Sequence, residues 1–369
     1  MPAWIGAQPV AYIPVIPDAA AGFNQPPSNF KDVVMRRLFF DPDPNGSDRS
    51  LRTYFFQVSY GRASLNPTVF DPVNAPDVSA VGVGQACYNL ISATLAQTNF
   101  QYACVVFPGA PFNPLDWAFP GNGVAKTNVT GFCYDFLASG VGPWAMELTH
   151  ILTYFLDLYG ISDSPGSFDN MACACGVHPS TFTKLNLGWL DPSEIVVVQS
   201  NAAATATLHA LGLPRPSPPG RVTAVKVPTP DPQHYYLIEA RLRTDTFEAG
   251  IPSEGVVVYE IQEAVWPPVH LRTATALGVS QSYDNYVNVL VKAAVPGGFT
   301  IEIGFPSNAV AVPDLSDMTL AEARAAVIAV GLRLASSGSG NVVAQRPMAD
   351  TSVPKGSVVH VDLRPPGNL

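Results

Sequence analysis

The chain has 369 residues, of which 47% are hydrophobic and 13% are charged, and its formal net charge is −9. A chain of this length and hydrophobic content can bury a sizeable core and predicts two or three folded domains. The negative charge argues against a nucleic-acid partner, because phosphate binding depends on clustered Lys and Arg. The apolar runs are shorter than the roughly 20 residues that a membrane span needs. We therefore expect a folded protein that does not cross a membrane.

The first domain, residues 1–191, is expected to mix helices and strands. Its segments are, in chain order, AYIPVIP (11–17) as a buried strand, FKDVVMRRLFF (30–40) and SLRTYFFQVSYG (50–61) as helices, QACYNLISATLAQ (85–97) as a helix, and YACVVFPG (102–109) as a strand that ends in a turn. A further helix is predicted in MELTHILTYFLDLYG (146–160), where apolar side chains recur every three or four residues.

The second domain, residues 192–306, shows alternating patterns that are typical of strands. They are EIVVVQ, ATATLHAL, RVTAVKV, HYYLIEARL, GVVVYEIQ, YVNVLVKA and FTIEIGF, with turn-forming stretches such as PRPSPPG between them. Short strands at this spacing predict an antiparallel β-sandwich. The overall fold class is therefore α+β.

The third unit, residues 312–369, contains one well-marked helix. Thr319 and Glu322 have the spacing of a capping box, which predicts the start of the helix, and Gly331 predicts its end. Strands are expected after the helix. The matching stretches are VPDL (312–315), MTLAEA (318–323), GL (331–332), QRP (345–347) and VPKGSV (353–358). Through them the unit resembles a PASTA domain, a small α/β module, and this resemblance implies peptidoglycan as a partner.

The first two domains resemble the immune-inhibitor-A type of secreted metallopeptidase. The matching pieces are LRTY (51–54), VSYGR (58–62), DLY (157–159), GSFDNM (166–171), HPS (178–180), KLNLGWL (184–190), YLIEAR (236–241) and GVVVY (255–259). The resemblance implies a zincin-like fold followed by the β-rich domain. It also implies a zinc site on the helix of residues 146–160, with two histidines, a glutamate between them and a later aspartate.

Part of that site is retained in this sequence. The resemblance assigns Glu147 to the general base, His150 to the second metal ligand and Met171 to the Met-containing turn below the metal. Met146 replaces the first histidine, and a thioether is a poor ligand for zinc. Asp157 stands one residue beyond the expected third ligand, so its use would require a bulge or a slipped turn.

The turn glycine that the resemblance implies is also missing, and Thr153 stands in its place. These departures favour a non-catalytic protein, which would act outside the cell as a structural or binding subunit with a protein partner or with copies of itself. Two alternatives stay open. One is a working zinc metalloendopeptidase with Glu147, His150 and Asp157, and the other is a peptidoglycan-binding protein. No resident cofactor is expected in the first reading, while zinc at low occupancy stays open.

A calcium loop is a further candidate site. Asp41, Asp43, Asn45 and Asp48 place oxygen donors at nearly alternate positions around a glycine turn, as calcium loops do. The same residue types also form ordinary solvated turns, so both interpretations stay open.

Five cysteines allow at most two disulfides within the chain. We expect Cys173 or Cys175 to pair with Cys87, Cys104 or Cys133. The alternative is a metal held by Cys173, Cys175 and His178. The N-terminal stretch lacks the pattern of a secretory signal, and an extracellular or cell-surface location is expected from the resemblances.

Overall fold

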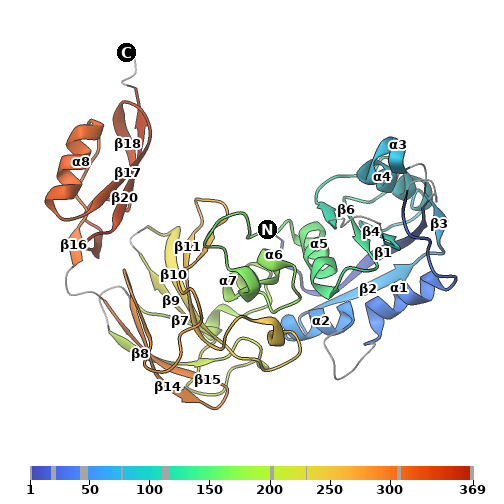
Figure 1. Cartoon of the computed structure of the whole chain (residues 1–369), viewed down its shortest axis with the longest axis horizontal. Helices are drawn as coiled ribbons and strands as arrows, with labels where there is room; N and C mark the ends of the chain where they lie inside the picture. The colour runs from blue at the N-terminus through green and yellow to red at the C-terminus, as the bar shows by residue number, and fades with distance from the viewer. Residues whose placement is uncertain are drawn as a thin grey trace. The chain divides into compact units, whose positions relative to one another are not determined.

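The computed structural model describes residues 2–17, 22–41, 49–75, 78–109, 116–199, 203–229, 231–305 and 309–365. It contains both helices and strands, which is compatible with the predicted α+β class (Figure 1). The chain divides into two compact units. The first contains residues 1–194, 211–216 and 241–253, and the second contains residues 195–210, 217–240 and 254–369. The division into three domains at residues 191 and 306 stays a prediction.

The first unit is built on a mixed sheet in the strand order β2-β1-β4-β6-β5. Its strands are β1 (Gly6–Ile16), β2 (Ala63–Val69), β3 (Val73–Asn74), β4 (Tyr102–Phe107), β5 (Trp117–Phe119) and β6 (Gly131–Phe136). The pairs β1-β2, β1-β4 and β4-β6 are parallel, and β3 also pairs with β1 in parallel. Strand β5 runs antiparallel at the edge, beside β6. The central strands are continuous apolar runs, as expected of parallel strands buried on both faces.

Each central strand sends alternate side chains to opposite faces of this sheet. One face forms an apolar core with residues such as Ile13, Val105 and the helix residue Leu90. On the other face the ring of Tyr12 stacks on Trp144, with 6.3 Å between the ring centroids. Trp144 belongs to helix α5 (Val141–Thr153), so α5 covers the second face.

The remaining helices of this unit are α1 (Phe30–Phe39), α2 (Leu51–Val58), α3 (Val78–Val81), α4 (Val83–Thr94), α6 (Asn170–Cys173) and α7 (Thr181–Asn186), with 3-10 turns at Gly166–Phe168, Pro192–Glu194 and Glu248–Gly250. Ser50 caps α2 by accepting a hydrogen bond from the Thr53 amide. Ser180 caps α7 in the same way through the Thr183 amide. These caps satisfy amides that a helix start leaves without internal partners.

Residues 241–253 follow a strand of the second unit but belong to the first unit. Arg241 and Glu248, both fully buried, form an ion pair with a nitrogen–oxygen distance of 2.7 Å. Arg241 also donates hydrogen bonds to the carbonyl oxygens of Phe168 and His178. A buried charge needs such compensation, so this segment is fixed in the first unit by its polar contacts.

Two mainly antiparallel sheets make up the β-rich part of the second unit. One has the order β12-β11-β10-β9-β7 and the other β13-β14-β15-β8. The strands are β7 (Ile195–Val197), β8 (Ala204–His209), β9 (Ala224–Pro228), β10 (His234–Arg241), β11 (Gly255–Gln262), β12 (Val269–Leu271), β13 (Ser282–Asp284), β14 (Asn288–Val295) and β15 (Gly298–Gly304). The seven predicted strand segments are therefore confirmed, and β12 and β13 are short additions.

The C-terminal part contains helix α8 (Leu320–Ala329) and the strands β16 (Ala309–Ala311), β17 (Arg333–Gly338), β18 (Asn341–Arg346), β19 (Ser352–Pro354) and β20 (Val358–Arg364). Figure 1 shows α8 lying along the three-stranded sheet β17-β20-β18. The predicted capping box of Thr319 and Glu322 is confirmed. Gly331 has a φ of +78° directly after the helix, which explains why glycine ends it.

In the described residues, helices long and apolar enough to cross a membrane are absent.

Candidate functional site

Helix α5 is buried along almost its whole length, including its polar residues. Glu147 is 7% exposed and His150 is 6% exposed. The apolar residues Leu148, Ile151 and Leu152 are also buried, as their helical spacing predicts. The helix therefore packs as a core element, and the ionisable side chains of Glu147 and His150 are almost completely shielded from water.

Both ring nitrogens of His150 have partners from the segment that follows the helix. Nδ1 contacts the carbonyl oxygen of Phe155, and Nε2 lies 2.9 Å from Oδ1 of Asp157. A carbonyl oxygen is an acceptor, so Nδ1 donates to Phe155, and Nε2 donates to the Asp157 carboxylate when the ring carries a second proton. Burial lowers the pKa of His150, but the hydrogen bond and the charge of Asp157 outweigh burial and the pKa is raised. A doubly protonated imidazole has no lone pair for a metal.

The turn after α5 comes one residue later than the resemblance implies. Thr153 is the last residue of the helix, and Tyr154 has a left-handed conformation with a φ of +58°. The Tyr154 amide donates to the carbonyl oxygen of His150. This displacement by one residue matches the displacement of Asp157 by one residue, which explains how Asp157 reaches His150 without a bulge. The sequence does not predict this turn, since tyrosine seldom adopts the left-handed conformation.

Burial raises the pKa of Glu147 to about 7, with the positive charge of His150 opposing the shift and Asp116 and Asp157 adding to it. Burial likewise raises the pKa of Asp116 to about 6. The carboxyl of Glu147 is therefore half-protonated near neutral pH. A value near 7 would suit a general base, so this residue alone does not decide whether the helix is catalytic.

The residues around His150 do not fit a zinc ion. Met146 offers only a thioether, and it is 4% exposed in the core. Nε2 of His150, the outward atom of the ring, is bonded to Asp157. Structural and catalytic zinc sites use three or four His, Cys or carboxylate ligands. Over the described ranges, the one group of three such side chains close enough to hold a metal is Cys104, Cys133 and Asp135.

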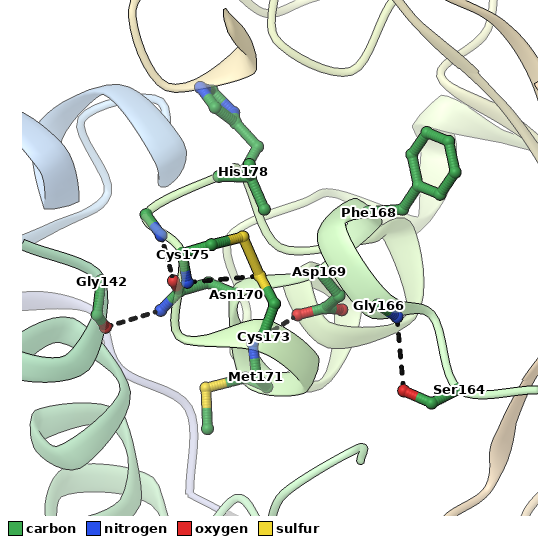
Figure 2. The surroundings of a disulfide bond; sticks show 12 residues. Gly142, Ser164, Gly166, Phe168, Asp169, Asn170, Met171, Cys173, Cys175 and His178 are labelled. Atoms are coloured by element: carbon green, nitrogen blue, oxygen red, sulfur yellow. Dashed lines mark hydrogen bonds between the residues drawn. A yellow bond between two sulfur atoms is a disulfide. The ribbon is translucent and has the colours of Figure 1, made fainter. Parts of the chain in front are cut away.

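Met171 lies in the short helix α6, within a compact segment that contacts the start of α5 through Asn170 and Gly142. It is 1% exposed, and its carbonyl oxygen accepts a hydrogen bond from the Leu158 amide at 2.8 Å. Asn170 donates to the carbonyl oxygen of Gly142 and accepts from the Gly176 amide, as Figure 2 shows. This compact segment therefore holds both α5 and the segment that carries Asp157.

The predicted disulfide pairing is wrong. Cys173 and Cys175 are joined to each other (Figure 2), while Cys87, Cys104 and Cys133 are free and buried. The pairing is local because the chain reverses between the two cysteines at the left-handed Ala174, whose φ is +50°.

The alternative of a metal held by Cys173, Cys175 and His178 is wrong as well. The imidazole of His178 points away from the two sulfur atoms in Figure 2. Its Nε2 lies 2.9 Å from a carboxylate oxygen of Asp245, and its Nδ1 lies 3.1 Å from Nζ of Lys184. Burial and the charge of Lys184 lower the pKa of His178. The ring is part of a buried polar network instead of a metal site.

Of the predicted calcium ligands, Asp41 is described, and Asp43, Asn45 and Asp48 lie outside the described residues. Asp41 accepts hydrogen bonds from the Ser50 amide and the Thr53 hydroxyl, and it forms an ion pair with Arg49 at 3.2 Å. These partners hold its pKa below the usual value although burial opposes them. Asp41 thus supports the start of helix α2, and calcium binding stays a prediction.

The cluster of Cys104, Cys133 and Asp135 was missed by the sequence analysis. Burial, and next the charge of Asp116, raises the pKa of Asp135, and burial raises the pKa of both thiols. The cluster forms because β4 and β6 pair with Cys104 opposite Cys133. The sequence alone does not reveal which residues of two distant strands stand opposite each other. The alternation Cys133-Tyr134-Asp135 does show that Cys133 and Asp135 share one face.

Residues 310–364 match the family model described as PASTA domain. A search of the curated proteins found no match to the chain. The match contains all five stretches on which the resemblance of the third unit rests, so the presence of a PASTA domain is confirmed. It covers only the C-terminal part and defines no family for the rest of the chain.

Proposed function

We propose that this protein is a non-catalytic relative of secreted metallopeptidases that acts outside the cell as a binding or structural subunit. The observation that carries the proposal is the bonding of His150, since both of its nitrogens are engaged by oxygen atoms of residues 155 and 157. The mixed sheet followed by the buried helix α5 supports a zincin-like fold for the first unit. The compact segment at Met171 supports it too.

The chemistry of peptide hydrolysis explains why the retained residues do not suffice. A metallopeptidase needs its metal to lower the pKa of water and to polarise the scissile carbonyl. The residues at α5 supply one imidazole without a lone pair and a thioether from Met146. Glu147 can accept a proton, but it has no activated water to take one from.

The proposal is tested with the full chain and two variants, Glu147→Gln and His150→Ala. We expect that neither the wild type nor either variant cleaves casein, and that His150→Ala leaves the zinc content unchanged. Stoichiometric zinc that is lost in His150→Ala, together with casein cleavage that is lost in Glu147→Gln, would establish the peptidase and end the proposal.

A second function, binding of peptidoglycan through the C-terminal unit, is favoured by the match to the PASTA domain. It is compatible with the first, because a wall-binding module can hold a non-catalytic subunit at the cell surface. The partner of the first unit would then be another protein or a second copy of the chain.

Neighbouring residues of α8 provide a matched pair for testing this second function. Val327 is fully buried, whereas Ile328 is 62% exposed. An aspartate at position 327 buries an uncompensated charge and unfolds the unit, and an aspartate at position 328 stays in water. In sedimentation with purified peptidoglycan, we expect the wild type and Ile328→Asp to be retained and Val327→Asp to be released. Equal retention of all three would remove the C-terminal unit as the binding element.

A further inference from the structure

A row of polar side chains crosses the sheet face that α5 covers. Tyr12, Cys104 and Cys133 are direct partners in the register of β1, β4 and β6. Asp135 stands two residues after Cys133 in β6, on the same face. Sγ of Cys104 lies 3.0 Å from Oδ2 of Asp135. The ligand atoms of the two cysteines and Asp135 all lie within 4.8 Å of one another.

This row is fully buried, and two of its polar atoms have no partner. Tyr12, Cys104, Cys133 and Asp135 are each 0% exposed. Among the described residues, Oδ1 of Asp135 and Oη of Tyr12 find no hydrogen-bond partner. Buried polar atoms are almost always satisfied, because an unpaired one loses its hydration without compensation. Three ligating groups that converge, one of them with an unpartnered oxygen, therefore indicate a missing ligand.

We propose that Cys104, Cys133 and Asp135 form a structural zinc site on the sheet face that Tyr12 shares. Thiolate and carboxylate are zinc ligands, and soft thiolates select zinc over calcium or magnesium. Ligands at about 2.0–2.3 Å from a tetrahedral zinc lie roughly 3.3–3.8 Å apart, so the present atoms, which lie 3.0 Å to at most 4.8 Å apart, need only small shifts.

The charges around the row are compatible with an ion. Two thiolates and one carboxylate carry three negative charges, zinc supplies two positive ones, and the charge of Arg37 acts on Asp135. The protons of the two thiols and the carboxyl leave for solvent as the metal binds. This site is distinct from the position of His150 on α5, and it does not depend on the proposed function.

The test is zinc analysis of the full chain, purified under reducing conditions from zinc-supplemented medium. We expect about one zinc per wild-type chain and at least a tenfold lower content in Cys133→Ala. Cys87→Ala is the matched control, since Cys87 is also buried but packs in the apolar core of the opposite face. His150→Ala is the second control, and both controls should keep their zinc.

A second measurement uses the wild type alone, in case Cys133→Ala does not fold. Wild-type protein refolded with a chelator should bind one equivalent of Co²⁺ with a sulfur-to-cobalt charge-transfer band, and its melting temperature should rise when zinc is added. A protein that binds no Co²⁺ and melts at the same temperature with and without zinc would overturn the site. So would a disulfide between Cys104 and Cys133 found by mass spectrometry. Zinc lost in His150→Ala but kept in Cys133→Ala would instead contradict both this site and the non-catalytic function.

Discussion

Replacing Glu147 by glutamine should stabilise the protein at alkaline pH and not at acid pH. Burial raises the pKa of Glu147 from 4.5 to about 7, so the folded state holds the proton more tightly than the unfolded state. The stability that comes from this proton is fully present below pH 4.5 and is lost as the pH rises toward 7. A shift of this size corresponds to about 3 kcal/mol above pH 7.

Glutamine keeps the shape of the protonated side chain and removes the charge. We therefore expect Glu147→Gln to melt at about the same temperature as the wild type near pH 4 and roughly 6–12 °C above it at pH 8. The assay is thermal unfolding of both proteins followed by circular dichroism across this pH range. The acid end serves as the internal control. Parallel curves for the two proteins, or a variant that is less stable at pH 8, would show that Glu147 is not held as a buried neutral carboxyl and would refute the reasoning.

Two further predictions concern the packing of the same unit. A Cβ at Gly142 would collide with the backbone carbonyl of Ala174, while a Cβ at Gly140 meets nothing within 4 Å. In denaturant unfolding, Gly142→Ala should therefore lower the free energy of unfolding by several kcal/mol and Gly140→Ala by less than about 1 kcal/mol. Equal losses for the two variants would contradict the predicted collision. Glu248→Ala leaves the charge of Arg241 buried and should lower the free energy of unfolding by about 3–5 kcal/mol. The control Asp71→Ala removes an exposed ion pair and should lower it by under about 1 kcal/mol. A small effect of Glu248→Ala would show that water reaches Arg241.

Local sequence signals predicted the elements that depend on local contacts. The capping box of Thr319 and Glu322 and the end of the helix at Gly331 are both confirmed, because each depends on atoms within a few residues. The predicted pairing of Cys173 is wrong, because the spacing of the cysteines does not reveal the backbone reversal at Ala174 that joins Cys173 to Cys175 and leaves three cysteines free. The row of Tyr12, Cys104 and Cys133 depends on a three-strand register over more than a hundred residues. Such a register follows from the packing of the whole sheet.

The buried His150 of α5 is satisfied by its bonds to the segment that follows the helix. Without Asp157, Nε2 of His150 would be an unpaired polar atom in a buried place. Because the chain turns at the left-handed Tyr154, directly after the last helical residue Thr153, the carboxylate of Asp157 reaches Nε2 of His150. The ion pair then satisfies both groups in a place where an unpaired charge is costly. The turn at Tyr154 and the position of Asp157 therefore act together, and the bond that they give His150 would have to break before a metal could bind Nε2.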